Sequence, residues 1–304
     1  MNIIEQKDEE TDPLLITGGW LVELDNYQEE GQIKFIDGDG KEIKFTPQSP
    51  EILSNEQRNY ITDRLTTINN LIFVEDKSNN DWEELVDIDE LVKFYMVQEL
   101  MDNCESFAGS CYWPKEQGED TKFKAGPVWD FGSMGSHWHN GDYNFFIYQM
   151  VPNHITDHWI GEIAKFPHFQ QKVRELWKQI YPGIIEQTKQ HCMDYVDYIT
   201  PAIGSDYKRW NILTPSSIPY YKTCVWDVLQ LKWNFLDRMW ALVGDVNFDY
   251  EVNVGDVSTI YDVILGIDKA HLVSADLNGD GNINAGDIST LYEIILATDK
   301  PIEQ

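Results

Sequence analysis

The sequence has few basic residues for its size. It contains 23 Lys and Arg against 52 Asp and Glu, which gives a formal net charge of −29 over 304 residues. So acidic a surface repels phosphate backbones and anionic lipid headgroups, and we therefore expect no binding to nucleic acid or to membranes. No apolar run approaches the roughly 20 residues that a membrane-spanning helix needs.

Cysteines and the common catalytic motifs are also scarce. The sequence shows no P-loop, G-x-S-x-G elbow, C-x-x-C pair or convincing pair of glycosidase carboxylates. His137 and His139 stand in a Gly-rich segment without a third ligand, so we interpret them as surface residues. Cys104 and Cys111 either pair or remain buried thiols. The four cysteines are too few and too scattered for a disulfide framework: Cys104, Cys111, Cys192 and Cys224.

What the sequence does contain is a tandem repeat near its C-terminus. The two copies start at Asp245 and Asp276, 31 residues apart, and read DVNFDYEVNVGDVSTIYDVILG and DLNGDGNINAGDISTLYEIILA. Alternate oxygen-bearing side chains in a tight loop converge on one point, which suits a hard cation that needs six to eight oxygens. We expect two calcium sites. Their candidate ligands are Asp245, Asn247, Asp249, Glu251, Asn253 and Asp256 in the first loop, and Asp276, Asn278, Asp280, Asn282, Asn284 and Asp287 in the second.

Each loop runs into a segment with the apolar spacing i, i+3, i+4, i+7, i+8, which predicts two helices that pack through one stripe each. The expected stripes are Val257, Ile260, Tyr261, Ile264 and Leu265, and Ile288, Leu291, Tyr292, Ile295 and Leu296. Position 6 is Gly281 in the second loop but Tyr250 in the first. Because the bend at this position favours glycine, we expect calcium to bind more weakly at the first site.

This repeat, over residues 244–304, resembles a type I dockerin. The resemblance implies a small all-α module that binds calcium and docks onto a cohesin module. It also implies an extracellular or cell-surface protein, associated with polysaccharide-degrading or cell-surface assemblies. The N-terminus MNIIEQKDEETDP is polar, so we expect a signal peptide to lie upstream of this chain. In dockerins the cohesin meets the helix surface that here carries two Ser-Thr pairs, and duplication offers two related faces; solvated helix surface is the alternative. The pairs are Ser258, Thr259, Ser289 and Thr290.

Residues 1–243 are predicted to form an α+β domain. A capping box at Ser54 and Gln57 starts a helix, and the Asp-Gly-Asp-Gly run at 37–40 predicts a hairpin. Since Gly244 follows with almost no linker, we expect the two modules to touch. The predicted strands are 14–25, 32–35, 42–45, 110–113 and 123–129; the predicted helices are 55–70, 87–103 and a mostly helical 156–242 that breaks near 182, 201 and 215–219 and ends in a helix over 225–242.

Several strings in residues 15–242 resemble the CotH kinase family of spore-coat-type atypical protein kinases. The resemblance implies a protein-kinase-like fold that transfers phosphate from ATP, with Mg²⁺, to secreted proteins. The strings are GGWLVELD (18–25), YMVQELMDN (95–103), SCYWPK (110–115), KAGPVWDF (124–131), SDYKRWNI (205–212) and LKWNFLDRMWAL (231–242).

The family's functional positions are only partly matched. The metal-binding aspartate of the family corresponds to Asp130, and Glu105 stands where the catalytic aspartate is expected. The longer arm of Glu displaces its carboxylate by about a methylene, which can cost about a hundredfold in rate. Ser110 follows Glu105 at the spacing of the Asp-to-Asn pair in kinase catalytic loops. Gly132 replaces a further carboxylate that the family often has.

The family's nucleotide-cradling strands and their lysine lie before the GGW strand, and only about 17 residues precede it here. We therefore predict a partial kinase-like domain without kinase activity. For Asp130 the alternative is a carboxylate that caps a turn, and for Glu105 a surface charge at a helix end. An active Ser/Thr kinase acting on secreted proteins is the alternative function. A glycan-binding accessory domain is another, because 11 Trp, 15 Tyr and 13 Phe permit surfaces that stack on sugars.

Overall fold

The computed structural model describes residues 10–103, 105–132, 146–149, 159–181, 183–211, 218–240, 242–247, 249, 251–267 and 272–298. The predictions for Cys104, His137, His139 and Tyr250 lie outside these residues. None of the helices in the described part of the chain combines the length and apolar character needed to cross a bilayer. Cys111 is a buried free thiol, so it is not paired with Cys104.

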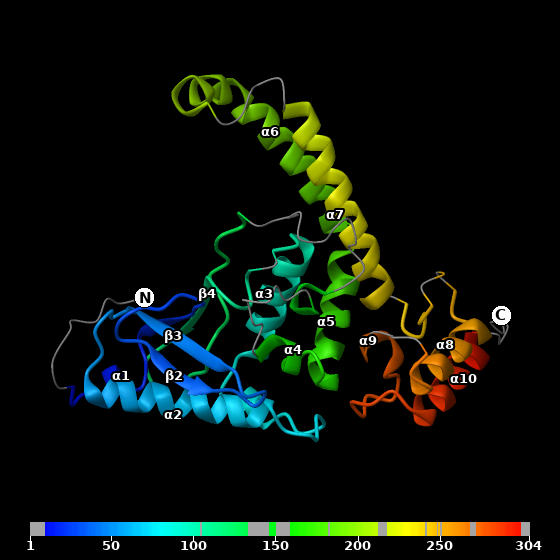
Figure 1. Cartoon of the computed structure of the whole chain (residues 1–304), viewed down its shortest axis with the longest axis horizontal. Helices are drawn as coiled ribbons and strands as arrows, with labels where there is room; N and C mark the ends of the chain where they lie inside the picture. The colour runs from blue at the N-terminus through cyan, green and yellow to red at the C-terminus, as the bar shows by residue number, and fades with distance from the viewer. Residues whose placement is uncertain are drawn as a thin grey trace.

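Four strands form one antiparallel sheet in the order β2-β3-β1-β4 (Figure 1). The predicted hairpin is confirmed, with Ile33 opposite Phe45. Its turn is closed by Asp37, whose Oδ1 accepts the N–H groups of Asp39 at 3.0 Å and Lys41 at 2.8 Å. This side chain to main chain bonding is typical of Asp in turns. The strands are β1 (Trp20–Leu24), β2 (Ile33–Ile36), β3 (Glu42–Ser49) and β4 (Cys111–Lys115).

Helices cover the sheet and continue beyond it. The capping box at Ser54 and Gln57 is present at the start of α2, which runs beside the sheet in Figure 1. The part of the chain before Gly244, called the body below, contains these helices: α1 (Pro13–Ile16), α2 (Asn55–Ile72), η1 (Asp81–Glu84), α3 (Ile88–Leu100), η3 (Ile147–Gln149), α4 (Trp159–Ile163), α5 (Pro167–Ile180), α6 (Gly183–Trp210) and α7 (Ile218–Trp240).

Aromatic side chains join the sheet to these helices in one hydrophobic core. The Trp159 ring of α4 lies 5.3 Å from that of Phe45 in β3 and 5.4 Å from that of Trp113 in β4. Tyr95 of α3 meets Phe169 of α5 edge-on at 5.3 Å. Such pairs add to the free energy gained from burying their apolar surface, so the core holds α3, α4 and α5 in fixed positions against the sheet.

Helices α6 and α7 run side by side and extend away from this body (Figure 1). The break predicted near residue 201 is wrong, because Pro201 lies inside α6 and the helix continues through it. Proline removes one main-chain hydrogen bond from a helix, and the helix tolerates this loss. The last predicted helix also begins earlier, at Ile218 rather than at residue 225.

Two predicted strands need correction. Residues 13–16 form α1 instead of the start of a strand, since Asp12 caps the N–H of Leu14 and Pro13 occupies the first turn. Beyond β4, the Lys124 N–H bonds to the Pro114 carbonyl at 3.0 Å and the Gly126 N–H to that of Tyr112 at 2.9 Å. Pro127 has no N–H with which to continue this ladder, and the strand predicted over 123–129 is not formed.

The C-terminal repeats form a second, smaller core. The first two stripe positions of each helix are buried, namely Val257, Ile260, Ile288 and Leu291. The predicted packing of the two helices against each other is confirmed, but it does not cover the whole stripes: Tyr261, Ile264, Leu265, Tyr292 and Leu296 are exposed. A contact between only two short helices covers a narrow strip of each, so the outer positions stay in solvent. The helices are α8 (Val254–Ile264), α9 (Leu272–Ala275) and α10 (Ala285–Thr298).

The two parts of the chain touch, as the absence of a linker predicts. Helix α9 lies against α7, and residues of α5 line one groove together with Asp276 to Gly279. In Figure 1 the orange loop after α9 reaches back toward α5.

Candidate functional sites

The second loop is organised around two aspartates at its ends. Asp287 Oδ1 accepts the N–H groups of Leu277 at 2.7 Å and Asn278 at 3.2 Å, and its Oδ2 accepts that of Asn284 at 2.7 Å. Asp276 accepts the N–H of Asp280 at 3.0 Å. Both aspartates are buried. These hydrogen bonds close the loop.

The first loop repeats this pattern residue for residue. Asp256 Oδ1 accepts the N–H groups of Val246 at 2.7 Å and Asn247 at 3.1 Å, and its Oδ2 accepts that of Asn253 at 2.8 Å. The N–H of Asp249 bonds to Asp245 Oδ1 at 3.1 Å. Since Tyr250 lies outside the described residues, the expected weakness of this site stays a prediction.

The remaining candidate ligands also take part in hydrogen bonds within the loops. Asp249 Oδ1 accepts the N–H of Glu251 and Asp280 Oδ1 that of Asn282, both at 2.9 Å. Asn253 and Asn284 use their Oδ1 atoms to cap the helices, through the N–H groups of Gly255 and Gly286 at 2.7 Å. To coordinate a cation, each of these two oxygens would have to bind it in addition to the N–H group or give up that hydrogen bond.

The electrostatics of the second loop favour a bound cation. Burial raises the pKa of Asp276, and the nearby carboxylates of Asp287 and Asp280 raise it further, while the N–H of Gly281 opposes the shift. Hydrogen bonds, first of all from Asn284, lower the pKa of Asp280. Within the described residues no three His, Cys, Asp or Glu side chains alone surround a metal position. A calcium ion here would need asparagine and main-chain oxygens as well, which hard cations accept, and the residues present offer them.

The two Ser-Thr pairs lie at equivalent places on α8 and α10. Ser258 and Ser289 are exposed, and Thr259 and Thr290 are half-buried. Each hydroxyl bonds back to the carbonyl four residues earlier, for example Thr259 to Gly255 at 3.3 Å and Thr290 to Gly286 at 3.2 Å. Next to these pairs stand the exposed apolar positions that the small core leaves uncovered.

In the body, the structure brings Asp130 together with Asn103 and Ser110. Asn103 donates from Nδ2 to the Asp130 carbonyl at 3.0 Å, and Ser110 Oγ lies 3.5 Å from Asp130 Oδ2. Asp130 is exposed and has a φ of 52°, in the left-handed region that few non-glycine residues adopt. The Glu105 carbonyl begins the turn that follows α3, accepting the N–H groups of Ala108 and Gly109.

A buried ion cluster behind this site is absent from the sequence-based predictions. Lys232 Nζ lies 2.8 Å from Glu99 Oε2 and 3.7 Å from Asp102 Oδ1, and all three side chains are 0% exposed. Burial raises the pKa of Glu99, and the Lys232 ammonium opposes that shift. The available signal was a lysine at helical spacing within the apolar run Leu229, Trp233 and Leu236.

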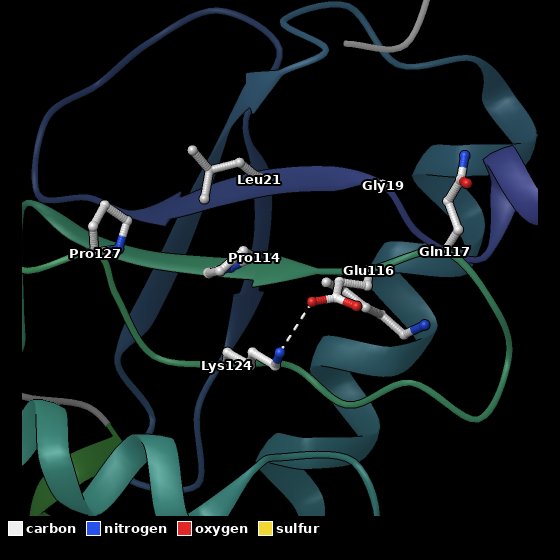
Figure 2. A pocket seen from close by; sticks show the side chains of 8 residues that line it. Gly19, Leu21, Pro114, Glu116, Gln117, Lys124 and Pro127 are labelled. Atoms are coloured by element: carbon white, nitrogen blue, oxygen red, sulfur yellow. Dashed lines mark hydrogen bonds and ion pairs between the residues drawn. The ribbon is translucent and has the colours of Figure 1, made fainter. Parts of the chain in front are cut away.

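A cleft of about 770 Å³ lies over the outer side of β1 and β4 (Figure 2). Figure 2 shows Leu21, Pro114 and Pro127 along it, and the ion pair between Lys124 and Glu116, 3.0 Å long, at its edge. Its described lining does not include Asp130 or Glu105. The cleft is thus separate from the group formed by Asn103, Ser110 and Asp130, called the Asp130 cluster below.

Two protein-family models match the chain. The model described as CotH kinase protein matches residues 3–236. The chain belongs to the CotH kinase protein family. The model described as Dockerin type I domain matches residues 243–296, so the CotH domain is followed by a type I dockerin. No curated protein and no solved structure matches the chain.

These matches confirm both resemblances inferred from the sequence. Type I dockerins bind calcium and cohesin modules and are typical of extracellular or cell-surface proteins. The CotH domain is observed as a mixture of helices with one small antiparallel sheet.

Proposed function

We propose that the chain is a secreted, calcium-dependent docking protein whose dockerin tethers a CotH domain without kinase activity to a cohesin-bearing assembly. One observation carries the calcium part. The two loops are separate segments of the sequence, yet each ends in a buried aspartate and both have the same hydrogen-bond pattern. Buried like charges are costly unless they are paired or coordinate a metal. A calcium ion in each loop removes that cost.

The proposed ligands are the residues at positions 1, 3, 5 and 12, with position 7 contributing its main-chain carbonyl and position 9 acting directly or through water. Calcium would neutralise the carboxylates and hold each loop closed against its helix. The ligands by residue are Asp245, Asn247, Asp249, Glu251, Asn253 and Asp256, and Asp276, Asn278, Asp280, Asn282, Asn284 and Asp287.

Cohesin would bind the outer surfaces of α8 and α10. Ser258 and Ser289 are exposed there, and Leu265 and Leu296 leave apolar area uncovered at 69% and 63% exposure. Apolar patches rimmed by polar side chains mark interaction surfaces. Because the two helices carry the same residues, either can present the binding face.

Binding to a cohesin, measured by surface plasmon resonance in calcium, tests this surface. We expect Ser258→Ala with Thr259→Ala to change the affinity little, because the second face remains. All four alanines together should weaken binding more than tenfold, about 1.4 kcal/mol. Unchanged affinity in the fourfold variant would show that cohesin binds elsewhere.

The proposed lack of kinase activity rests on the Asp130 cluster. Asp130 is an exposed carboxylate, and the described side chain that its Oδ2 contacts is the hydroxyl of Ser110. Phosphoryl transfer needs metal ions held against the phosphates and a positioned base. Gly132 offers no carboxylate, although a Cβ there would lie only 3.2 Å from Asp130 Oδ1.

An active kinase is the second candidate, since the structure does place Asn103, Ser110 and Asp130 together. In that case Asp130 would hold Mg²⁺ and Glu105 would accept the proton of the acceptor hydroxyl. Transfer of labelled phosphate from ATP to secreted proteins decides between the two. We expect no more label with the wild-type chain than with Asp130→Ala; label that depends on Asp130 would establish kinase activity.

A role on polysaccharides is the third candidate, and one feature of α6 favours it. The rings of Tyr195 and Tyr198 lie 6.1 Å apart and are 56% and 79% exposed. Affinity electrophoresis on plant polysaccharides, with Tyr195→Ala and Tyr198→Ala combined, tests it. Retardation that the double variant loses would support glycan binding by α6, and equal mobility in all gels would exclude it.

A further inference from the structure

The glycines of the second calcium loop lie against the CotH domain. Gly279 has a φ of +73°, and a Cβ there would stand 3.2 Å from Cβ of Pro167, the first residue of α5. A Cβ at Gly281 would lie 3.8 Å from Lys77 Cγ. The first loop has Phe248 and Tyr250 at these positions. Only the second loop therefore has the small residues that allow this close approach.

The same contact places a cation next to the loop. Arg174 of α5 lines a groove of about 440 Å³ together with Asp276 and Asn278. Its guanidinium is 5.8 Å from the centre of the Trp240 ring, so α7 helps to hold it in place. Asp276, at 3% exposure, is the loop residue whose charge acts on Arg174. One carboxylate thus faces both an arginine and the position proposed for calcium.

We propose that the second calcium loop is a clasp between the two domains, in which cation binding is coupled to packing on α5 and Arg174 sets the calcium affinity. The inference rests on the proposed role of Asp276 and Asp287 as ligands. A guanidinium beside a divalent ion repels it, and the repulsion is strong where water is excluded. Calcium in turn orders the loop that carries Gly279 onto Pro167.

Calorimetric titration of the full chain with calcium chloride tests the role of Arg174. Asp256→Asn in all samples leaves the second loop as the binding site. In that background we expect Arg174→Gln to tighten calcium binding by about three- to tenfold, because a nearby positive charge is removed. Lys172→Gln is the matched control, since Lys172 lies on the same helix but pairs with Asp89 at 2.7 Å; it should leave the affinity unchanged.

Equal or weaker binding in Arg174→Gln than in Lys172→Gln overturns the role of Arg174. Absence of any calcium binding in the Asp256→Asn background would instead refute the ligand assignment in the proposed function.

Hydrogen exchange on the unsubstituted chain tests the coupling without any variant. We expect calcium to slow amide exchange in the first turns of α5, at least severalfold relative to a chelator, because the loop then packs on Pro167. Exchange in the β2-β3 hairpin, at the edge of the sheet opposite β4, serves as the reference. Calcium-independent exchange in α5, together with slowed exchange in the loop itself, would overturn the clasp while leaving calcium binding intact.

Discussion

Lys115, at the end of β4, shows how a single buried amine is held in this molecule. Its Nζ donates to the carbonyls of Thr17 and Gly118 and to Thr121 Oγ1, and it lies 5.9 Å from the Trp20 ring. Burial, together with a smaller effect of the Arg64 charge, lowers its pKa from 10.5 to about 8. The folded chain therefore releases this proton far more easily than the unfolded chain does.

The expected consequence is a pH-dependent contribution to stability. Between about pH 8 and the usual lysine pKa near 10.5 the unfolded state binds more protons at Lys115, so its contribution to the free energy of unfolding rises with pH. Urea denaturation of the wild type and Lys115→Met over pH 7 to 10 measures it. The wild type should gain relative to the variant as pH rises.

Lys124→Met provides a control that should show no such gain over pH 7 to 10. The hydrogen bond and charge of Glu116 raise the pKa of Lys124, so its contribution is present below the unfolded pKa and is lost as pH rises through the folded pKa. Parallel curves for wild type and Lys115→Met would contradict the burial argument.

Helices α3 and α7 are tied by a buried charge cluster as well as by apolar packing. Glu99 of α3 accepts the N–H of Ile147 at 3.1 Å and pairs with Lys232 of α7. Asp102, at the end of the same helix, lies next to Asn103, which holds the Asp130 carbonyl. The cluster thus connects the long α6-α7 pair to the Asp130 site through elements that the core already fixes.

Removing the charge of Lys232 alone should destabilise the fold more than removing the charges of Lys232 and Glu99 together. Lys232→Met leaves Glu99 buried without its cation, and we expect the free energy of unfolding to fall by about 3–5 kcal/mol. Glu99→Gln combined with Lys232→Met should restore much of this loss. Because burial raises the pKa of Glu99, the deficit of the single variant should shrink as pH falls and Glu99 is protonated. A deficit that is constant from pH 8 to 5 would argue against the charge.

At the scale of the whole molecule, the net charge of −29 is an excess of negative charge that bound cations would partly offset. The described residues form two hydrophobic cores, a large one in the CotH domain and a small one in the dockerin. The small core contains few side chains and surrounds two acidic loops. A module of this size commonly depends on a metal for stability.

Calcium removal should therefore unfold the dockerin before the CotH domain. We expect a chelator to reduce far-ultraviolet circular dichroism by the signal of α8 and α10 while near-ultraviolet signals of the tryptophan core persist. Calcium at about 100 times its dissociation constant should add about 2.7 kcal/mol per site to stability. Asp256→Asn with Asp287→Asn should match the chelated wild type and ignore calcium; identical spectra with and without chelator in the wild type would contradict the prediction.

Local patterns were sufficient for much of this structure. The capping box at Ser54, the Asp-Gly turn after β2 and the duplicated loops all rest on interactions between residues close in sequence, so the sequence predicts them directly. The family resemblances on either side of Gly244 were confirmed for the same reason, since their motifs are contiguous strings. Errors arose where a local pattern depended on its surroundings, as with Pro201 inside α6 and the strand predicted over 123–129, which is not formed.

The sequence by itself determined the two duplicated loops, the candidate calcium ligands in them and the family of each part. Only the tertiary structure decided which stripe positions are buried, that Lys232 meets Glu99, and that Gly279 lies on Pro167. The last two contacts join residues more than a hundred positions apart, and no local periodicity encodes such a pairing. The repeat looks symmetric in sequence, but only its second copy has glycine at loop positions 4 and 6, and there Gly279 approaches Pro167 of α5 so closely that a side chain would be crowded.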